Sequence, residues 1–327
     1  MSIKENILEL FEKNRGTYFS GEYIAKELSV SRAAVWKAVK TLQRDGYSID
    51  AVPNKGYCLA CSTDILSPQG IQKYLNADIP KIDINVIPTT NSTNTEVREK
   101  INTGISEGYL VIANEQASGR GRLGRSFFSP KDTGIYMSLL LKPSFCSGEQ
   151  ATQITTIAAV AVCEAIESVS SEKASIKWVN DIFVRNKKVC GILTEGSFNL
   201  ESGQLDYAIL GIGINVYTPK DGFPDDLKQI AGSVFTSNQN DIKNRLVSEI
   251  LNRFFFYYNN SSNYAEEYRR RSFVIGKEVS LVSSDKSDTA TVIDIDNQCR
   301  LKVRYNDGKE EYFSSGEISI RMQTKKS

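Results

Sequence analysis

The segment Gly119–Arg125 concentrates three glycines and three arginines within seven residues. Glycine lets the backbone approach a ligand closely, and arginine forms bidentate contacts with carboxylate or phosphate groups. The spacing also matches G-x-G-x-x-G, but that pattern indicates dinucleotide binding only where a helix follows, and Ser126–Pro130 does not begin one. The segment therefore predicts a loop that binds an anion, with a solvated basic hairpin as the alternative.

Two further segments carry residues suited to the same chemistry. The run Lys177-Trp178-Val179-Asn180-Asp181 lies at the junction of two predicted strands, so Lys177 can project from an alternating strand into a cleft. The run Gly211-Ile212-Gly213-Ile214-Asn215 places two glycines inside a strand, where they either allow a close approach to the backbone or mark a bulge.

The chain contains no histidine and six cysteines. A Ser-His-Asp triad, a Cys-His pair and an HExxH zinc site are therefore excluded. Cys58 and Cys61 form a Cys-x-x-Cys pair, but a structural zinc site needs four ligands and the sequence has no second such pair. The chemistry must depend on Lys, Arg, Asp, Glu, backbone amides or bound Mg²⁺.

Length and composition are typical of a globular chain with two or three domains: 327 residues, 40% hydrophobic and 24% charged. No run of about 18 uncharged apolar residues occurs, and charged residues occupy the start of the chain, where a signal peptide would be apolar. The sparse cysteines fit a reducing compartment. We expect a cytoplasmic protein with no membrane partner. A net charge of +1 makes the distribution of charge the guide to nucleic-acid binding.

Residues 1–61 predict three helices followed by a hairpin. In the first helix Ile3, Ile7, Leu10 and Phe11 share one face. Serines are placed to cap the second and third helices, and a glycine is placed to end the third; these are Ser20, Ser31 and Gly46. The short turn before the third helix favours a helix-turn-helix, and the hairpin after it favours the winged form.

The third predicted helix carries a basic stripe on its outward face. Arg32, Trp36, Lys37 and Lys40 lie on that stripe, and Lys55 lies at the tip of the hairpin. This is where a recognition helix and wing meet DNA. The alternative is a small helical interaction module whose charges are only solvated.

Residues 62–271 mix strands and helices, which indicates a central α/β domain in an α+β multidomain chain. Ser62–Asp64 is a candidate linker. A broad apolar stripe over Ala151–Val169 predicts one long helix that packs on a sheet. Shorter helices are predicted at Thr93–Asn102, Asp241–Tyr258 and Tyr264–Arg270. Alternation and turn residues predict strands at Ile82–Ile87, Tyr109–Asn114, Ile135–Leu141, Ser175–Trp178, Ile182–Val184, Val189–Thr194 and Tyr207–Val216.

Residues 272–327 predict a third, all-β domain. Short alternating segments between Val279 and Ile320 are separated by turn sequences such as Asn306-Asp307-Gly308. Strands of this length and spacing are typical of a small barrel.

Taken together, these segments resemble the bifunctional biotin–protein ligase and biotin operon repressor family, and the resemblance runs along essentially the whole chain. The Gly119–Arg125 loop and the Lys177 cluster are its most specific parts. It also rests on Ser31–Ala34, Asn54–Tyr57, Asn91–Asn94, Phe128–Pro130, Lys188–Glu195, Gly211–Asn215 and Ser315–Ser319. The resemblance implies a class II synthetase-like core of the biotin/lipoate ligase type and an SH3-like C-terminal barrel.

The resemblance also implies a role for each matching residue. Lys177 and Arg122 would be catalytic. The biotin site would contain Ser92, Thr93, Asn94, Gln116, Arg120, Gly121, Arg122, Lys177 and Gly191. The adenylate site would contain Arg120, Arg122, Lys177, Asn180, Gly213 and Asn215. The chemistry of the reaction, rather than the resemblance, makes Asp181 a candidate metal ligand or base. Val179 stands where the family usually has proline, and Gly232 where it more often has threonine, so contacts on the adenine side are left unassigned.

By the same resemblance the substrates are biotin and ATP with Mg²⁺, and biotinyl-AMP is both intermediate and corepressor. The partners implied are a biotin carboxyl carrier protein of acetyl-CoA carboxylase, other biotin-dependent carboxylases, operator DNA and a second copy of the chain in a ligand-induced homodimer. Two alternatives remain, a lipoate–protein ligase and a transcription regulator that only senses a small molecule.

Overall fold

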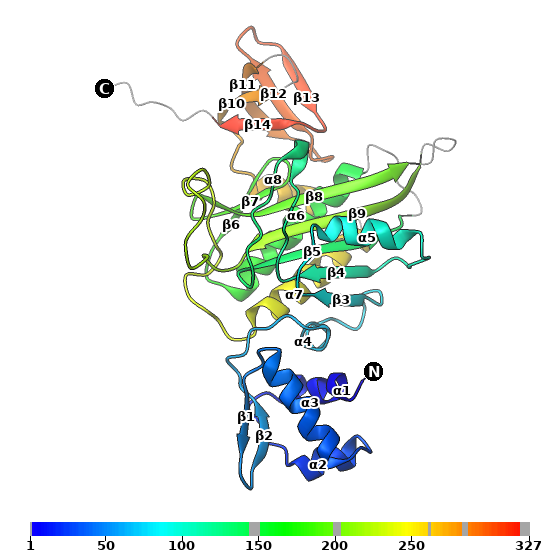
Figure 1. Cartoon of the computed structure of the whole chain (residues 1–327). Coiled ribbons are helices and arrows are strands. Elements are labelled where there is room, and N and C mark those ends of the chain that lie inside the picture. The colour runs from blue at the N-terminus through cyan, green and yellow to red at the C-terminus, as the bar shows by residue number, and fades with distance from the viewer. Residues whose placement is uncertain (1, 144–150, 199–203, 261–262, 283–286, 321–327) are drawn as a thin grey trace. The chain divides into compact units, whose positions relative to one another are not determined.

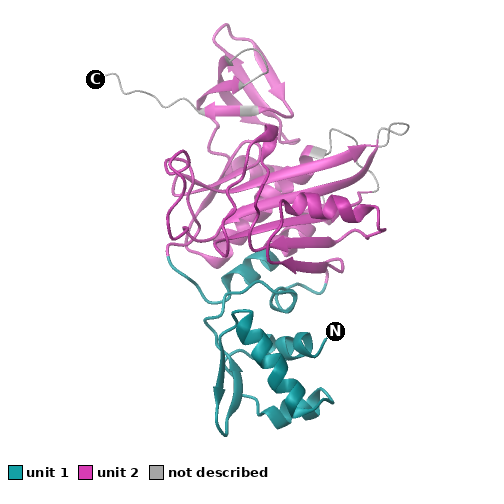
Figure 2. Ribbon diagram, viewed as in Figure 1, with its two compact units in different colours: residues 1–77, 237–249 teal, residues 78–236, 250–327 magenta. Residues whose placement is uncertain are grey.

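The computed structural model describes residues 2–143, 151–198, 204–260, 263–282 and 287–320 (Figure 1). Contacts divide the chain into two units (Figure 2). One unit contains residues 1–77 and 237–249, and the other contains residues 78–236 and 250–327.

Three helices and a hairpin form the N-terminal part of the first unit, as predicted. Ser20 and Ser31 accept hydrogen bonds from the first turns of the second and third helices, and Gly46 follows the third with φ +96°. The apolar core includes Phe11, Ile24 and Leu42. The elements are α1 (Ile3–Lys13), α2 (Gly21–Glu27), α3 (Arg32–Arg44), β1 (Ile49–Val52) and β2 (Gly56–Leu59).

The buried face of α1 differs from the prediction. Ile3 is 38% exposed, and Leu10 is only partly buried against the core. Ile7, Leu8 and Phe11 are buried, because the side chains that face α3 follow the helical period from residue 7 onward. Glu12, a charged residue, is buried beside them.

The predicted linker is held by hydrogen bonds within the first unit. Thr63 is buried, and Asp64 Oδ1 accepts from the backbone N–H of Lys243 at 2.9 Å. The N–H of Ser67 donates to Asn244 Oδ1 at 3.0 Å. These bonds join the segment before α4 (Pro68–Gln72) to the first turn of α7 (Ile242–Asn260). Arg15, which follows α1, donates to the carbonyl of Thr63 at 2.5 Å and so ties this segment to the N-terminal helices and hairpin, here called the head (residues 1–61). Contacts therefore group residues 62–77 with the head, while a domain boundary at 61/62 stays a prediction.

A seven-stranded mixed sheet forms the centre of the second unit (Figure 1). Its order is β3-β4-β5-β9-β8-β7-β6, in which β3 and β4 are parallel and all other neighbours are antiparallel. All seven predicted strands are confirmed, and β8 extends beyond its predicted end. The strands are β3 (Asp83–Ile87), β4 (Tyr109–Ala113), β5 (Gly134–Leu141), β6 (Ala174–Lys177), β7 (Asp181–Val184), β8 (Lys187–Phe198) and β9 (Leu205–Asn215).

Helices cover both faces of the sheet. Leu193 of β8 opposes Gly211 of β9, and this face meets α5 (Thr93–Ile101). The next residue, Thr194, points to the other face, where its hydroxyl contacts that of Thr155 on α6 (Ala151–Val169) at 2.7 Å. By length and composition alone, Thr152–Val169 could cross a membrane, but 67% of that window is buried inside the protein, as in a core helix.

The C-terminal residues form a five-stranded antiparallel sheet in the order β13-β12-β11-β10-β14. Val279, Val292, Leu301 and Val303 form its apolar side. It follows α8 (Tyr264–Arg271). The strands are β10 (Glu278–Val282), β11 (Ser287–Ile295), β12 (Leu301–Tyr305), β13 (Glu310–Phe313) and β14 (Glu317–Ile320).

Candidate active site and DNA-binding face

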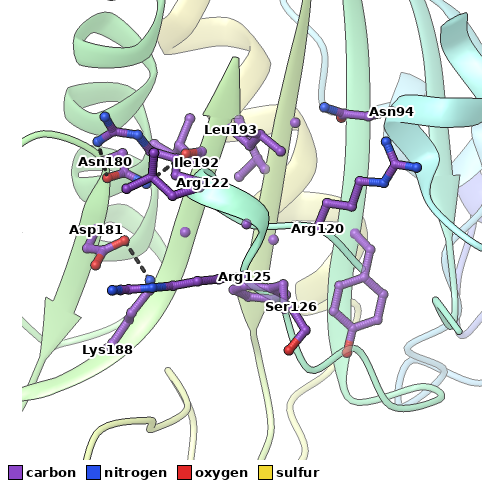
Figure 3. Close-up of a pocket in the computed structure, with 18 of the residues that line it drawn as sticks. Asn94, Arg120, Arg122, Arg125, Ser126, Asn180, Asp181, Lys188, Ile192 and Leu193 are labelled. Carbon is purple, nitrogen blue, oxygen red and sulfur yellow. Dashed lines mark hydrogen bonds and ion pairs between the residues drawn. The ribbon is translucent and has the colours of Figure 1, made fainter. Parts of the chain in front are cut away.

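A cavity in the second unit gathers the predicted site from segments far apart in the sequence (Figure 3). The N-terminus of α5, the loop after β4, the turn between β6 and β7, and strands β5, β8 and β9 all contribute to it. Residues of the C-terminal sheet complete it. Residues from the predicted sets that line the cavity are Ser92, Thr93, Asn94, Gln116, Arg120, Gly121, Arg122, Lys177, Asn180, Asp181, Gly191 and Gly213.

One end of the cavity is a buried polar network around the start of α5. Gln116 Oε1 accepts from the backbone N–H of Thr93 at 2.9 Å, and Gln116 Nε2 donates to Ser129 Oγ at 2.9 Å. The Ser138 hydroxyl lies 2.6 Å from Thr93 Oγ1 and 2.5 Å from Asn94 Oδ1. Because these side chains are held by one another, they form a preorganised set of donors and acceptors for a polar ligand ring.

The orientation of Asn94 explains a glycine in the strand below it. Asn94 Nδ2 donates to Glu195 Oε2 at 2.6 Å, and Glu195 in turn pairs with Arg98 at 2.8 Å. A Cβ atom at Gly211 would lie 2.4 Å from Asn94 Oδ1. Similarly, a Cβ atom at Gly213 would lie 2.6 Å from the ring of Phe127. The glycines of β9 therefore admit side chains of the site itself, which confirms the predicted close approach.

Backbone hydrogen bonds close the loop Gly119–Arg125, which we call the arginine loop. The N–H of Gly121 donates to the carbonyl of Arg125 at 2.7 Å, and the N–H of Phe127 donates to the carbonyl of Gly119 at 2.8 Å. Only a single 3₁₀ turn, Arg122–Gly124, lies between them. As predicted, the loop does not begin a dinucleotide-binding helix.

The arginine side chains leave the loop in different directions (Figure 3). Arg122 Nη1 donates to Asn180 Oδ1 at 3.1 Å, whereas Arg120 extends away from Asn180 and is exposed. Two positive groups are thus separated across the cavity. An extended ligand with more than one anionic group can contact both guanidinium groups.

The turn after β6 presents Lys177 and Asn180 to the cavity. Asn180 Nδ2 donates to the carbonyl of Ile192 at 2.9 Å, which ties the turn to β8. Asp181 pairs with Lys188 at 2.6 Å (Figure 3). Lys177 ends β6 opposite Asp181 in the strand register and lines the cavity, as predicted.

One predicted residue lies elsewhere, and several lining residues were not predicted. The amide of Asn215 donates to the carbonyl of Gly232 at 3.0 Å, and Asn215 is not among the lining residues. The lining residues to which the sequence assigned no individual role are Leu123, Arg125, Ser126, Phe127, Tyr136, Met137, Trp178, Lys188, Ile192, Leu193, Gly211, Ile212, Gly316 and Ile318. Lys188 and Gly316 lie in motifs that carry the family resemblance, so those motifs were the available signal.

Nucleophilic thiol chemistry does not suit this site. Cys190 lies on β8 beside the cavity, but burial raises its pKa well above the usual range, so the thiol stays protonated. Among the described residues, no three Cys, Asp or Glu side chains cluster as a dedicated metal site would require. The site therefore offers fixed hydrogen-bond donors and cationic groups.

The predicted DNA-binding residues are all exposed and lie on α3 and in the hairpin turn of the first unit. Arg32, Trp36, Lys37 and Lys40 are exposed on α3, and Trp36 keeps 55% of its surface accessible. Lys55, in the turn between β1 and β2, is exposed and lies 5.7 Å from the centre of the Tyr18 ring. An exposed tryptophan among cations is unusual for a merely solvated face.

Comparisons with known proteins agree with this geometry. Residues 86–215 match the Biotin/lipoate A/B protein ligase family, residues 4–58 an HTH domain and residues 274–321 the Biotin protein ligase C terminal domain. The Bifunctional ligase/repressor BirA of Bacillus spizizenii is 38% identical over 233 residues, which is 71% of each chain. The protein of that name from Escherichia coli is 26% identical over 327 residues, covering 95% of each chain.

A solved structure agrees as well. The biotin protein ligase from Aquifex aeolicus in complex with biotin and ATP superposes with a TM-score of 0.61 at 26% identity, covering 73% of this chain and 98% of that one. The chain therefore belongs to the family of bifunctional biotin–protein ligases and repressors.

Proposed function

We propose that the protein is an ATP-dependent biotin–protein ligase that also represses transcription. It forms biotinyl-5'-AMP from biotin and ATP and then transfers biotin to a lysine of a biotin carboxyl carrier protein. The observation that carries this proposal is the cavity itself. It brings the polar network around Asn94, the arginine loop and Lys177 into one site, within a fold shared with a ligase that binds biotin and ATP.

Adenylation joins two anions, because the biotin carboxylate attacks the α-phosphate of ATP and pyrophosphate departs. Lys177 and Arg122, which lie on the Asn180 side of the cavity, supply positive charge where the carboxylate and α-phosphate meet. Arg120 and Gly121 supply a cation and a flexible backbone from the loop. The ring of biotin occupies the polar network, which includes Ser92, Thr93, Asn94 and Gln116, and Gly191 of β8 completes the biotin site.

The second step needs a deprotonated acceptor amine and an anhydride protected from water. The ε-amine of the carrier lysine attacks the carbonyl carbon of the mixed anhydride, and AMP leaves with the bonding electron pair. The arginine loop excludes water from the intermediate. Asn180, Gly213 and Asn215 belong to the adenylate side of the site, with Asn215 acting through the segment it bonds at Gly232.

Mg²⁺ would accompany ATP. The cation usually binds one or two carboxylates together with substrate phosphates and water. Among the described residues that line the cavity, Asp181 is the only carboxylate, and it is paired with Lys188, so the residues suit a cation carried mainly by the triphosphate. When bound, Mg²⁺ supplies charge neutralisation for the departing pyrophosphate.

The remaining parts of the proposal concern regulation. Arg32, Trp36, Lys37, Lys40 and Lys55 contact operator DNA, and biotinyl-AMP acts as corepressor in a homodimer. One edge of β8 pairs with β9, and the other edge pairs with β7 only between Lys187 and Gly191. Among the described strands, none pairs with this second edge from Leu193 to Phe198, so it is available to a second sheet. We further propose a class II synthetase-like core, an SH3-like arrangement of β10–β14, a cytoplasmic location and other biotin-dependent carboxylases as additional acceptors.

Pyrophosphate release from ATP tests the function. We expect release with biotin and none with lipoate. Release with lipoate alone would indicate a lipoate–protein ligase, and no release with either would indicate a regulator that only senses a small molecule. Lys177→Ala should abolish release with little change in the free energy of unfolding, because Lys177 acts on the reacting anions. Retained turnover would remove Lys177 from its assigned role.

A further inference from the structure

The segment that presents Lys177 is held by the C-terminal part of the second unit. The indole Nε1–H of Trp178 donates to the carbonyl of Cys299 at 2.9 Å. The hydroxyl of Tyr268 donates to the carbonyl of Val179 at 2.9 Å. Both side chains are almost fully buried, with Trp178 4% and Tyr268 0% exposed. The two bonds thus hold Trp178 and Val179, the two residues that follow Lys177, and neither Trp178 nor Tyr268 has a role in the chemistry described above.

The carbonyl that receives the indole proton is itself held by a tight turn. Cys299 lies between β11 and β12 with φ +57°. Asp296 Oδ1 accepts from the backbone N–H groups of Gln298 and Arg300, both at 2.9 Å, and its other oxygen accepts from Arg300 Nε at 2.7 Å. The turn between β11 and β12 is therefore a rigid acceptor for Trp178.

Two side chains thus anchor the segment: Tyr268 of α8 is the first anchor and Trp178 is the second. Helix α8 is itself tied to the turn between β11 and β12. Arg269 Nη2 donates to Asn297 Oδ1 at 2.9 Å, and Arg271 pairs with Glu167 of α6 at 2.8 Å. Burial raises the pKa of Tyr268 well above the usual range, so its phenol stays protonated and remains a donor. Helix α8 and the β11–β12 turn, which are bonded to each other, thus form hydrogen bonds with the Val179 carbonyl and the Trp178 indole.

The same tryptophan also reaches the wall of the cavity. A Cβ atom at Gly316 would lie 3.8 Å from the Trp178 ring, and both residues line the cavity with Lys177. The C-terminal sheet therefore contacts the Lys177–Val179 segment through Trp178 and also contributes lining residues to the cavity.

We propose that Tyr268 and Trp178 are positioning residues through which α8 and the C-terminal sheet hold Lys177 in place for adenylation. The inference rests on the proposed function. The polar network around Asn94 lies on other elements, so loss of either anchor should leave biotin binding nearly intact. A misplacement of about 1 Å can cost about 100-fold in rate. We therefore expect kcat to fall by about 10- to 100-fold, while KM for biotin changes less than about threefold.

Tyr268→Phe tests the first anchor and has a matched control in the same unit. Tyr257 also donates one hydroxyl hydrogen bond, to Glu164 Oε1 at 2.8 Å, but on α7 away from the cavity-lining residues. Each phenylalanine variant removes one hydroxyl and keeps the ring. Biotin-dependent pyrophosphate release and the thermal unfolding midpoint should be measured for both variants.

Tyr268→Phe should lower kcat, Tyr257→Phe should not, and the two should lose comparable stability. Trp178→Phe, which removes the second anchor, should also lower kcat at nearly constant KM for biotin. Equal kcat in Tyr268→Phe and wild type would overturn the proposal. So would a parallel loss of kcat, biotin affinity and unfolding midpoint, which indicates a general structural role. A wild-type chain that releases no pyrophosphate would instead refute the proposed function and, with it, this inference.

Discussion

Replacing Glu12 with glutamine should destabilise the DNA-binding head. Glu12 has a fully buried side chain. Its carboxylate accepts two hydrogen bonds from Arg15, both at 2.8 Å, and one from Lys73 at 2.7 Å. Asp241 completes the cluster, contacting Arg15 at 2.8 Å and Lys73 at 2.5 Å. Burial alone would lower the pKa values of Arg15 and Lys73, but the two carboxylates raise them.

The magnitude follows from what Glu12→Gln leaves behind. Removing one partner of a buried ion pair costs about 3–5 kcal/mol, because the remaining charge stays buried without compensation. Asp241 still contacts both cations, so we expect the lower end, about 3 kcal/mol. The new amide also turns a donor toward cations that can only donate, which adds to the loss.

Native-state hydrogen exchange can locate this loss within the chain. Protection of the slowest amides in α1–α3 should fall by about two orders of magnitude, whereas amides in β5 and β9 should be unaffected. Lys13→Ala is the control, since it removes an exposed pair with Glu9 at 2.6 Å and should cost less than about 1 kcal/mol. If Glu12→Gln lowered protection no more than Lys13→Ala, the buried cluster would not stabilise the head as argued.

Three further predictions concern DNA, the biotin site and pH. Reversing the charge of Arg32 and Lys37 should weaken operator binding, reduce the magnitude of the log–log salt slope by about two and leave pyrophosphate release unchanged; an unchanged slope would argue against phosphate contacts. Gly211→Ala should displace Asn94 and raise KM for biotin in the same assay, and an unaltered KM would contradict this geometry. Burial raises the pKa of Tyr136, so its contribution to stability should be complete below about pH 10 and lost as pH rises further. Tyr136→Phe should flatten that part of a urea-midpoint profile, and an identical profile would count against the assignment.

Local patterns predicted the elements of this fold well. Apolar alternation located the strands of the central sheet, and serine caps located the starts of α2 and α3. Such signals lie within a few residues of the structure they specify. The buried charge at Glu12 could not be predicted this way, because its partner Lys73 is 61 residues away, and Arg15 and Asp241 are 226 residues apart.

The parts of the candidate site that could be predicted are those in which the residue type itself indicates the chemistry. The residue types of the arginine loop and Lys177 predict an anion site, and both line the cavity. Trp178 lies in the Lys177 run, but its role in holding that run could not be predicted, because its partner is a backbone carbonyl 121 residues away and a carbonyl carries no residue-specific signal. Asn215 was assigned by resemblance, and its hydrogen bond to Gly232 depends on how the chain folds after β9.

Calorimetric titration with biotin, in the presence and absence of ATP, tests the central claim most directly. We expect biotin to bind alone, because the polar network around Asn94 is held together by hydrogen bonds between protein groups. We expect its apparent affinity to increase with ATP as biotinyl-AMP forms and is retained. Absence of binding heat under both conditions, or the same affinity in both, would contradict the account.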